Sequence, residues 1–238
     1  LFTPDEEIGT PSVRDLIEAE ASRARAVLVP EPGRPGGGVT SGRYAIARFN
    51  IRTRGKPSHA GARLSEGRSA IREMAKRILE IEGMTGPDCT FSVGVVSAGR
   101  WVNCVSSLAE AEVLTMAKRQ ADLDDGVERM LALADPDAEV AFEVERGVTR
   151  PVWEPDAGTH ELLAIAEHFA KQLGRPFRHE SSGGGSDGNF TGAMGVPTLD
   201  GLGVDGDGLH TLNEHIEVES LAARGRVFAG MLATIGAG

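Results

Sequence analysis

The sequence predicts an α/β domain that is interrupted by an inserted α+β domain. Residues 26–29 are wholly apolar, which is typical of a strand buried on both faces of a parallel sheet. Over residues 44–54, apolar and polar residues alternate instead, which indicates a strand with one buried and one exposed face. After about residue 149 the first pattern returns. The predicted domains are 1–40 with 149–238, and 41–148.

Composition excludes several classes of partner. The 238 residues are 40% hydrophobic and 25% charged, as in ordinary globular proteins. A net charge of −10 argues against nucleic acid and anionic membranes as partners. No apolar run approaches the roughly 20 residues that span a bilayer. Cys89 and Cys104 give no disulfide framework, so we expect buried thiols and a cytoplasmic location.

The first segment predicts one helix and one strand. The helix covers residues 12–25, and the strand at 26–29 ends at Pro30-Glu31-Pro32, where two prolines restrict the carboxylate between them. The Gly- and Pro-rich residues 33–42 indicate a linker. Leu1-Phe2 resembles the end of a buried strand, and with no initiator Met we expect that sequence upstream is missing.

The inserted segment predicts the element order β-α-β-β-α-β. This order matches the ferredoxin-like arrangement, a four-stranded sheet with two helices on one face. The expected strands are 44–54, 90–96, 111–117 and 138–144, and the expected helices are 66–82 and 124–134, the second capped by Asp122 or Asp124.

The last segment predicts an α/β pattern again, so the outer domain has an incomplete mixed sheet with helices on both faces. Its glycine-rich loop covers residues 181–188. The expected helices are 159–173 (with Thr159 as its N-cap), a turn at 189–194, and 217–235; the expected strands are 177–180 and 196–199.

Acidic side chains and one histidine indicate a metal site. Asp5-Glu6-Glu7 places like charges side by side, which favours either solvent or a bound cation. Glu31 follows a predicted core strand, and ligands bind beyond the carboxyl ends of such strands. His210 lies in a loop rich in Gly and Asp. Oxygen and imidazole ligands from distant loops are typical of catalytic zinc.

A set of motifs along the chain resembles a known family. They are Asp5-Glu6-Glu7-Ile8-Gly9, Glu31-Pro32, Gly55-Lys56-Pro57-Ser58-His59-Ala60-Gly61, Gly183-Gly184-Gly185-Ser186-Asp187, and His210 with Glu214. In this order they resemble the co-catalytic zinc aminoacylase/carboxypeptidase family, nearest its glutamate carboxypeptidase-like branch. That family also includes acetylornithine deacetylase and succinyl-diaminopimelate desuccinylase. The resemblance covers essentially the whole chain.

The resemblance implies a catalytic α/β domain with an inserted lid that also forms a dimer. Glu6 would be the general base that deprotonates a metal-bridging water. Glu7 and His210 would bind one of two divalent metal ions and Glu31 the other. Zinc is expected, with cobalt or manganese as alternatives. The implied reaction is hydrolysis of an amide bond, either at the C-terminal amino acid of a small peptide or in an N-acyl amino acid.

Further roles follow from the same resemblance. His59 would reach into the active site of a partner subunit and stabilise the oxyanion, which predicts a homodimer through the lid domain. Asn103 matches an asparagine that contacts the substrate. The backbone amides of Gly183, Gly184 and Gly185 could approach a substrate carboxylate closely.

The chain departs from the family pattern at two points. Met116 stands where the family usually has an arginine that binds the substrate carboxylate, which puts glutamate-type specificity in doubt. Arg100, Lys118 or Arg119 could take the place of that arginine. The first zinc histidine and the bridging aspartate lie upstream of the acidic motif in the family, and nothing precedes Leu1 here. We therefore expect these 238 residues alone to bind zinc weakly and to be inactive.

Two other functions fit parts of the sequence. Gly184 to Gly188 matches the G-x-S-x-G elbow of serine hydrolases, with Ser186 as the nucleophile and acidic and histidine residues following in the right order. However, residues 178–182 are too polar for the buried strand that such an elbow requires. The chain could also be a dimerising or ligand-binding module without catalysis. Intact Glu6, Glu7, Glu31 and His210 argue against that alternative.

Overall fold

The computed structural model describes residues 1–34 and 36–236, which form two compact units. Unit 1 comprises Leu1–Tyr44 and Arg150–Gly238, and unit 2 comprises Ala45–Thr149. Residue 35 of the predicted linker and residues 237–238 of the predicted outer domain lie outside the described residues. Among the helices within residues 1–34 and 36–236, none has the length and apolar character needed to cross a membrane.

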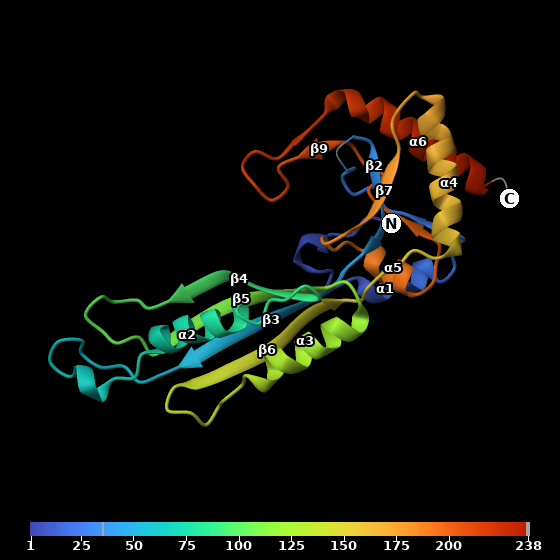
Figure 1. The fold of residues 1–238 in the computed structure, drawn as a ribbon. Coiled ribbons are helices and arrows are strands. Elements are labelled where there is room, and N and C mark those ends of the chain that lie inside the picture. Colours follow the sequence, from blue (N-terminus) through green and yellow to red (C-terminus); the bar gives the residue numbers. More distant parts are fainter. Residues whose placement is uncertain (35, 237–238) are drawn as a thin grey trace. The chain divides into compact units, whose positions relative to one another are not determined.

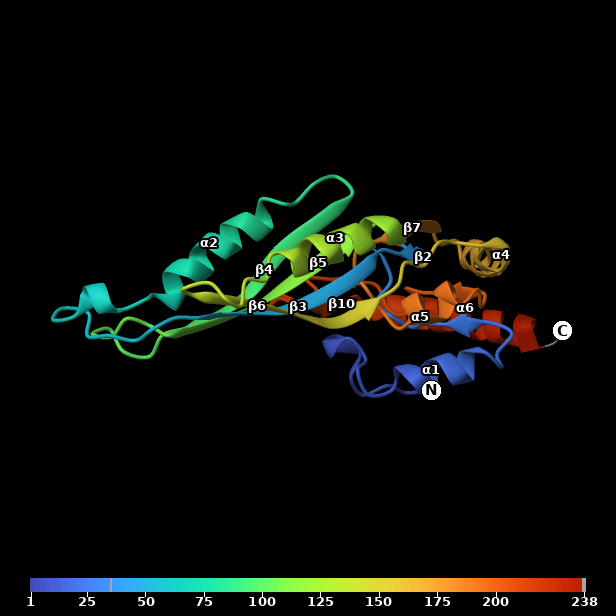
Figure 2. The same ribbon diagram turned by 90° about the horizontal axis from the view of Figure 1, so that it is seen from below.

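Unit 2 is a four-stranded sheet with two helices. The strand order is β4-β5-β3-β6, and β5 pairs antiparallel with both of its neighbours β3 and β4. Both helices lie on the same face of this sheet (Figures 1 and 2). The elements are β3 (Ala45–Arg54), α2 (Ala70–Glu82), β4 (Cys89–Ala98), β5 (Leu108–Ala117), α3 (Gln120–Ala132) and β6 (Ala141–Arg150).

The core of unit 2 lies between its sheet and its helices. β3 turns alternate side chains inward, so that Phe49 and Ile51 are each 1% exposed. From the helices, α2 contributes Met74 and α3 contributes Met130, both fully enclosed. Ser69 caps α2, because its hydroxyl accepts a hydrogen bond of 3.2 Å from the backbone N–H of Arg72.

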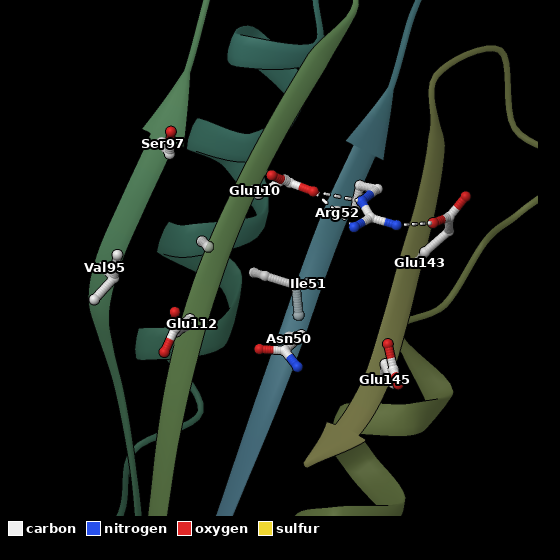
Figure 3. A pocket seen from close by; sticks show the side chains of 10 residues that line it. Asn50, Ile51, Arg52, Val95, Ser97, Glu110, Glu112, Glu143 and Glu145 are labelled. Carbon is white, nitrogen blue, oxygen red and sulfur yellow. Dashed lines mark hydrogen bonds and ion pairs between the residues drawn. The ribbon is translucent and has the colours of Figure 1, made fainter. Parts of the chain in front are cut away.

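The opposite face of this sheet is polar. Arg52 on β3 pairs with Glu110 on β5 at 2.7 Å and with Glu143 on β6 at 3.6 Å, as Figure 3 shows. These side chains line a shallow hollow of about 270 Å³ together with the neighbouring Glu112 and Glu145. The alternation predicted for residues 44–54 therefore corresponds to one apolar and one charged face.

Unit 1 is built from short strands and four helices of the described chain. β1 pairs parallel with β8, β2 pairs parallel with β7, and a single bridge between Thr40 and Asp200 links β2 to the end of β8. The strands are β1 (Val27–Leu28), β2 (Gly38–Arg43), β7 (Arg178–Ser182), β8 (Thr198–Leu199), β9 (Gly206–Asp207) and β10 (His215–Ile216). The helices are α1 (Arg14–Ala21), α4 (Ala157–Gln172), α5 (Gly188–Ala193) and α6 (Val218–Gly236).

The main core of unit 1 lies where α4 and α6 pack on β2 and β8. The two helices run side by side in Figure 1. Their inward residues meet Val39 of β2 and Leu199 of β8, both of which are 0% exposed. This packing fixes the carboxyl ends of β2 and β8, where the polar residues discussed below begin.

The prediction that residues 33–42 form a linker is wrong for the second half of this range. Residues 38–43 form β2, a strand that is buried along its whole length and hydrogen-bonded to β7. Most residues of this strand are Gly, Thr or Ser. Ser41 Oγ lies 3.0 Å from Nδ1 of His179. The turn signal applies to the residues before the strand, where Gly36 and Gly37 have positive φ.

Other predicted boundaries also differ. α4 begins at Ala157, because Asp156 and not Thr159 is its cap; the Asp156 carboxylate accepts from the Thr159 amide at 2.7 Å. α3 begins at Gln120, one turn before the predicted start. The predicted strand end Leu1-Phe2 lies outside any strand and is exposed.

The strand β1 is half-buried, although the sequence predicted burial on both faces. In the described part of the chain it pairs with β8 alone, so its second edge has no neighbouring strand.

A glycine in α5 tests the packing of unit 1. A Cβ at Gly192 would lie 2.1 Å from the indole of Trp153, which is 2% exposed. We expect Gly192→Ala to lower the unfolding free energy by about 2 kcal/mol, because the buried ring cannot move away without cost. Gly225→Ala in α6 is the control, since nothing lies within 4 Å of its Cβ. Gly225→Ala should raise the unfolding free energy by roughly 0.5 kcal/mol. Urea titrations of both variants measure the two changes.

Candidate active site

A buried arginine holds the acidic motif in place. Glu6 lies in a single turn, Glu6–Ile8, that ends at Gly9 in the left-handed conformation. Arg150, 4% exposed, donates to Glu6 Oε1 at 2.9 Å and to the Glu6 carbonyl at 2.9 Å. It also donates to Thr10 Oγ1 at 3.1 Å. One guanidinium therefore fixes both the backbone and the side chain of Glu6.

Asp187 ties the same segment to the glycine-rich loop. Its carboxylate accepts from Arg150 at 3.2 Å, from Thr10 Oγ1 at 2.5 Å and from Thr3 Oγ1 at 3.0 Å. Thr10 is 1% exposed and has a φ of 61°, a conformation that is strained for a β-branched residue. These contacts bring the first ten residues against the loop that precedes α5.

A second buried pair positions the glycine-rich loop itself. Arg43 Nε donates to Asp200 Oδ2 at 2.6 Å, and Arg43 Nη1 donates to the carbonyl of Gly184 at 2.6 Å. Asp200 is 0% exposed and directly follows β8. The amide of Gly184 donates to Ser182 Oγ at 3.1 Å, so this N–H already has an intramolecular partner.

Glu31 lies in the field of the acidic motif. Burial raises its pKa from 4.5 to about 7, and the charges of Asp200, Glu6 and Glu7 contribute in the same direction. Burial also raises the pKa of Glu6; Arg150 opposes this increase, while Asp187 and Glu7 add to it. Carboxylates from three separate segments therefore share one region of negative potential.

His210 and Glu7 lie at the exposed rim of this region. His210 Nδ1 is 3.9 Å from Glu7 Oε2, and both side chains are about 80% exposed. His210 lies between β9 and β10 with a φ of 62°, and its amide donates to Glu214 Oε2 at 3.1 Å. A non-glycine residue in this conformation is uncommon, although histidine adopts it more readily than most.

In unit 2, His59 and Asn103 line one hollow. The chain around His59 pairs with the chain around Cys104: the Ala60 amide donates to the Asn103 carbonyl at 2.9 Å, and the Val105 amide donates to the Ser58 carbonyl at 2.9 Å. Trp101 and Pro57 are among the other residues that line this hollow, which has a volume of about 320 Å³. Two candidates that are 44 positions apart in the sequence thus lie together.

Ser186 is not arranged as a nucleophile. Its side chain is 0% exposed, and its hydroxyl donates to Asp200 Oδ2 at 2.5 Å. It also accepts from the Gly188 amide at 3.0 Å. Within the described residues no histidine is hydrogen-bonded to it. Ser186 therefore serves to hold the glycine-rich loop against Asp200.

The residues that organise the site are Arg43, Arg150, Asp187 and Asp200. Sequence reasoning missed the two arginines and gave the two aspartates no organising role, although Asp187 stands in the glycine-rich motif. Asp200 carried a usable signal, because it follows a short apolar strand and so lies at a strand's carboxyl end. Arg150 carried none, since a single arginine at the end of a polar strand indicates an exposed residue.

The comparisons with known proteins match the chain along its length. The model of peptidase family M20/M25/M40 matches residues 1–234. The chain belongs to this family. Carboxypeptidase G2 of Pseudomonas sp. (strain RS-16) is 30% identical over 247 residues, covering 100% of this chain and 59% of the relative. Succinyl-diaminopimelate desuccinylase of Thioalkalivibrio sulfidiphilus is 25% identical over 98% of this chain and 65% of the relative.

Solved structures agree with this membership in the M20/M25/M40 family. The crystal structure of aminopeptidase PepT from Bacillus cereus superposes with a TM-score of 0.75 at 26% identity, covering 98% of this chain and 63% of that one. The chain thus spans about three-fifths of the length of the relatives it matches.

The M20/M25/M40 family is generally metal-dependent, and the donor types of the site fit a divalent cation. Carboxylates with raised pKa values and an exposed imidazole are ligands that such ions accept. However, within residues 1–34 and 36–236 no three His, Cys, Asp or Glu side chains are arranged as a complete binding group. The residues present therefore fit part of a metal site.

Arg150 allows a test of the network around Glu6. We expect Arg150→Gln to lower the unfolding free energy by about 3 kcal/mol at neutral pH, because it leaves the partly buried carboxylates of Glu6 and Asp187 without a cation. The deficit should shrink as the pH falls toward the raised pKa of Glu6, because the protonated carboxyl no longer needs the cation. Urea titrations across pH measure it. Arg146→Gln, an exposed change on the same strand, should stay within about 0.5 kcal/mol of wild type; a similar small loss in both variants would contradict the network.

Glu31 predicts a pH dependence of the metal-free chain. Its folded pKa of about 7 lies above its ordinary value of 4.5, so the folded state binds the proton more tightly. Stability should therefore fall as the pH rises from about 5 to about 8. Glu31→Gln should flatten this slope, and Glu161→Gln, an exposed change on α4, should leave it unchanged. Equal slopes in wild type and Glu31→Gln would show that Glu31 titrates normally.

Proposed function

We propose that the complete protein is a metal-dependent hydrolase of amide bonds. Its substrate would be a small peptide that loses its C-terminal amino acid, or an N-acyl amino acid. Membership of the M20/M25/M40 family and relatives named as a carboxypeptidase and a desuccinylase support this class of reaction. The observation that carries the proposal is the shared negative region of Glu6, Glu7 and Glu31, with His210 at its edge.

In this proposal Glu7 and His210 bind one divalent ion and Glu31 binds a second. Zinc is the expected metal, with cobalt or manganese as alternatives. Bound divalent ions would polarise the amide carbonyl and lower the pKa of water to near neutrality. Burial is the main cause of the raised pKa of Glu31 and the neighbouring carboxylates add to it; a cation would offset both effects.

Glu6 is the proposed general base and acid. Its carboxylate accepts a proton from the attacking water as the new C–O bond forms at the amide carbon. It then gives this proton to the amine nitrogen as the C–N bond breaks, so the products are a carboxylate and an amine. Its burial favours this exchange, because the raised pKa brings the group nearer to working pH, while Arg150 fixes its position.

We assign unit 1 to the catalytic domain and unit 2 to a ferredoxin-like lid that also forms a homodimer. The β-α-β-β-α-β order and the strand order β4-β5-β3-β6 support the lid assignment. His59 and Asn103 would contact the substrate, and their position in one hollow supports a joint role. The incomplete group of ligands supports weak zinc binding and low activity for the 238 residues alone.

Met116 and the glycine-rich loop are the proposed determinants of substrate choice. Met116 lies on β5, where the family pattern leads us to expect an arginine, and a thioether cannot pair with a carboxylate. In the glycine-rich loop, Gly183 and Gly185 would supply backbone amides, since the amide of Gly184 is bonded to Ser182. These observations fit a substrate whose group next to Met116 carries no negative charge.

A second candidate is a dimerising or ligand-binding module without catalysis. Met116 and the incomplete group of ligands favour it. The two candidates differ in what Glu6 does, because binding alone does not require a proton acceptor next to a metal ligand.

Glu6→Gln in the complete protein tests the proposal. We expect kcat to fall by about 10²–10⁴, because the water loses its proton acceptor, with KM and zinc content nearly unchanged. Hydrolysis of a panel of N-acyl amino acids and dipeptides provides the measurement. Glu161→Gln is the matched control and should retain wild-type rates.

Two outcomes would reject the hydrolase proposal. The first is full activity after zinc is removed with a chelator. The second is the absence of amide hydrolysis by the zinc-loaded complete protein across the whole panel, which would favour the non-catalytic module.

A further inference from the structure

The turn that follows His59 directs two backbone amides at one nitrogen of its ring. The N–H groups of Gly61 and Ala62 each donate to His59 Nδ1 at 3.1 Å. The Arg63 amide donates to the His59 carbonyl at 3.0 Å and closes the turn. The Nδ1 lone pair is therefore used as an acceptor.

A neutral imidazole carries its proton on one nitrogen and accepts hydrogen bonds on the other. A proton on Nδ1 of His59 would point at two N–H groups and lose both hydrogen bonds. We propose that the turn formed by residues 59–62 holds His59 in the tautomer with its proton on Nε2, and so makes it a hydrogen-bond donor to substrate. The amides of Gly61 and Ala62 are then positioning groups. The catalytic consequence rests on the proposed function, whereas the tautomer does not.

The backbone around His59 is fixed on its other side as well. The flanking residues Ser58 and Ala60 are hydrogen-bonded to the segment 103–105. These bonds hold the backbone that carries the ring, so the Nδ1 contacts with Gly61 and Ala62 depend on a fixed turn. His59 and Asn103 line the same hollow, so two residues whose side chains can donate hydrogen bonds border one space. This combination suits a ligand oxygen that gains negative charge, such as the carbonyl of an amide under attack.

His215 provides an internal reference with the opposite tautomer. Its Nδ1 lies 2.8 Å from the backbone carbonyl of Asn213, which can only accept. His215 must therefore carry its proton on Nδ1. The Nδ1 resonances of His59 and His215 should therefore differ within one spectrum of the wild-type protein.

Long-range ¹H–¹⁵N correlation spectra of histidine side chains test the tautomer directly. They are recorded at about pH 8, above the ordinary imidazole pKa of about 6.5. We expect Nδ1 of His59 to resonate as an unprotonated nitrogen and Nδ1 of His215 as a protonated one. Assignment uses His59→Gln and His215→Gln. A protonated Nδ1 at His59, or fast exchange between both tautomers, would overturn the proposal.

Gly61→Pro removes one of the two donors, and Gly61→Ala is its matched control. The Cβ of the alanine would lie 3.6 Å from the His59 ring, an ordinary contact, and it keeps the N–H. With one hydrogen bond lost, we expect the fraction of His59 with its proton on Nδ1 to rise by about fivefold in Gly61→Pro. Gly61→Ala should match wild type. An unchanged tautomer in a folded Gly61→Pro variant would overturn the role of the amide, and the wild-type spectrum decides the tautomer if that variant does not fold.

Turnover by the complete protein separates this inference from the proposed function. A lower kcat in Gly61→Pro than in Gly61→Ala, at similar KM, supports the positioning role. Full turnover in His59→Gln would reject the proposed part of His59 in the reaction, while the spectrum would still decide its tautomer.

Discussion

The site depends on one buried cation, the guanidinium of Arg150. An isolated charge in a protein interior costs several kcal/mol, so a buried arginine is stable only where acceptors surround it. Here the acceptors are the carboxylate and carbonyl of Glu6, the hydroxyl of Thr10 and the carboxylate of Asp187. The acidic turn has too few residues to fix its own geometry, and Arg150 supplies that geometry from outside.

The same arrangement recurs elsewhere in unit 1. Arg43 holds Asp200 and the glycine-rich loop, and Arg224 pairs with Asp205 at 2.9 Å while donating to the Gly38 carbonyl at the start of β2. Each buried arginine neutralises an aspartate that anchors a loop. Burial raises the pKa of Glu31 all the same, and the charges of Asp200, Glu6 and Glu7 add to this, so a negative potential remains where the loops meet.

Much of the architecture could be read from periodicity. The alternation at 44–54 corresponds to β3, and the amphipathic pattern ending at Glu82 corresponds to α2. Boundaries failed where a cap or a small-residue strand decided them, as at Asp156 and in β2. Composition cannot separate a strand of Gly, Thr and Ser from a linker, because its burial depends on β7, which lies more than a hundred residues later.

The residues of the candidate site also differ in how well the sequence predicts them. Glu6, Glu31 and His59 stand in local patterns that a reader of the sequence can find. Arg150 and Asp200 do not, because their partners lie 144 and 157 positions away in the chain. The pairing that places His59 beside Asn103 also joins segments that are far apart in the sequence, so no local pattern indicates it. Sequence patterns thus indicate chemically active groups better than they indicate the groups that hold them.

The carboxylate of Asp187 receives hydrogen bonds from both chain segments of unit 1. Two donors, Thr3 and Thr10, lie 184 and 177 positions upstream, and the third, Arg150, lies 37 positions upstream. Contacts of such high order form late, since the entropy of closing large loops must be overcome first. The acidic turn therefore acquires its shape only after the surrounding scaffold has consolidated. The conformation of the acidic turn is accordingly a late product of folding and cannot serve as its nucleus.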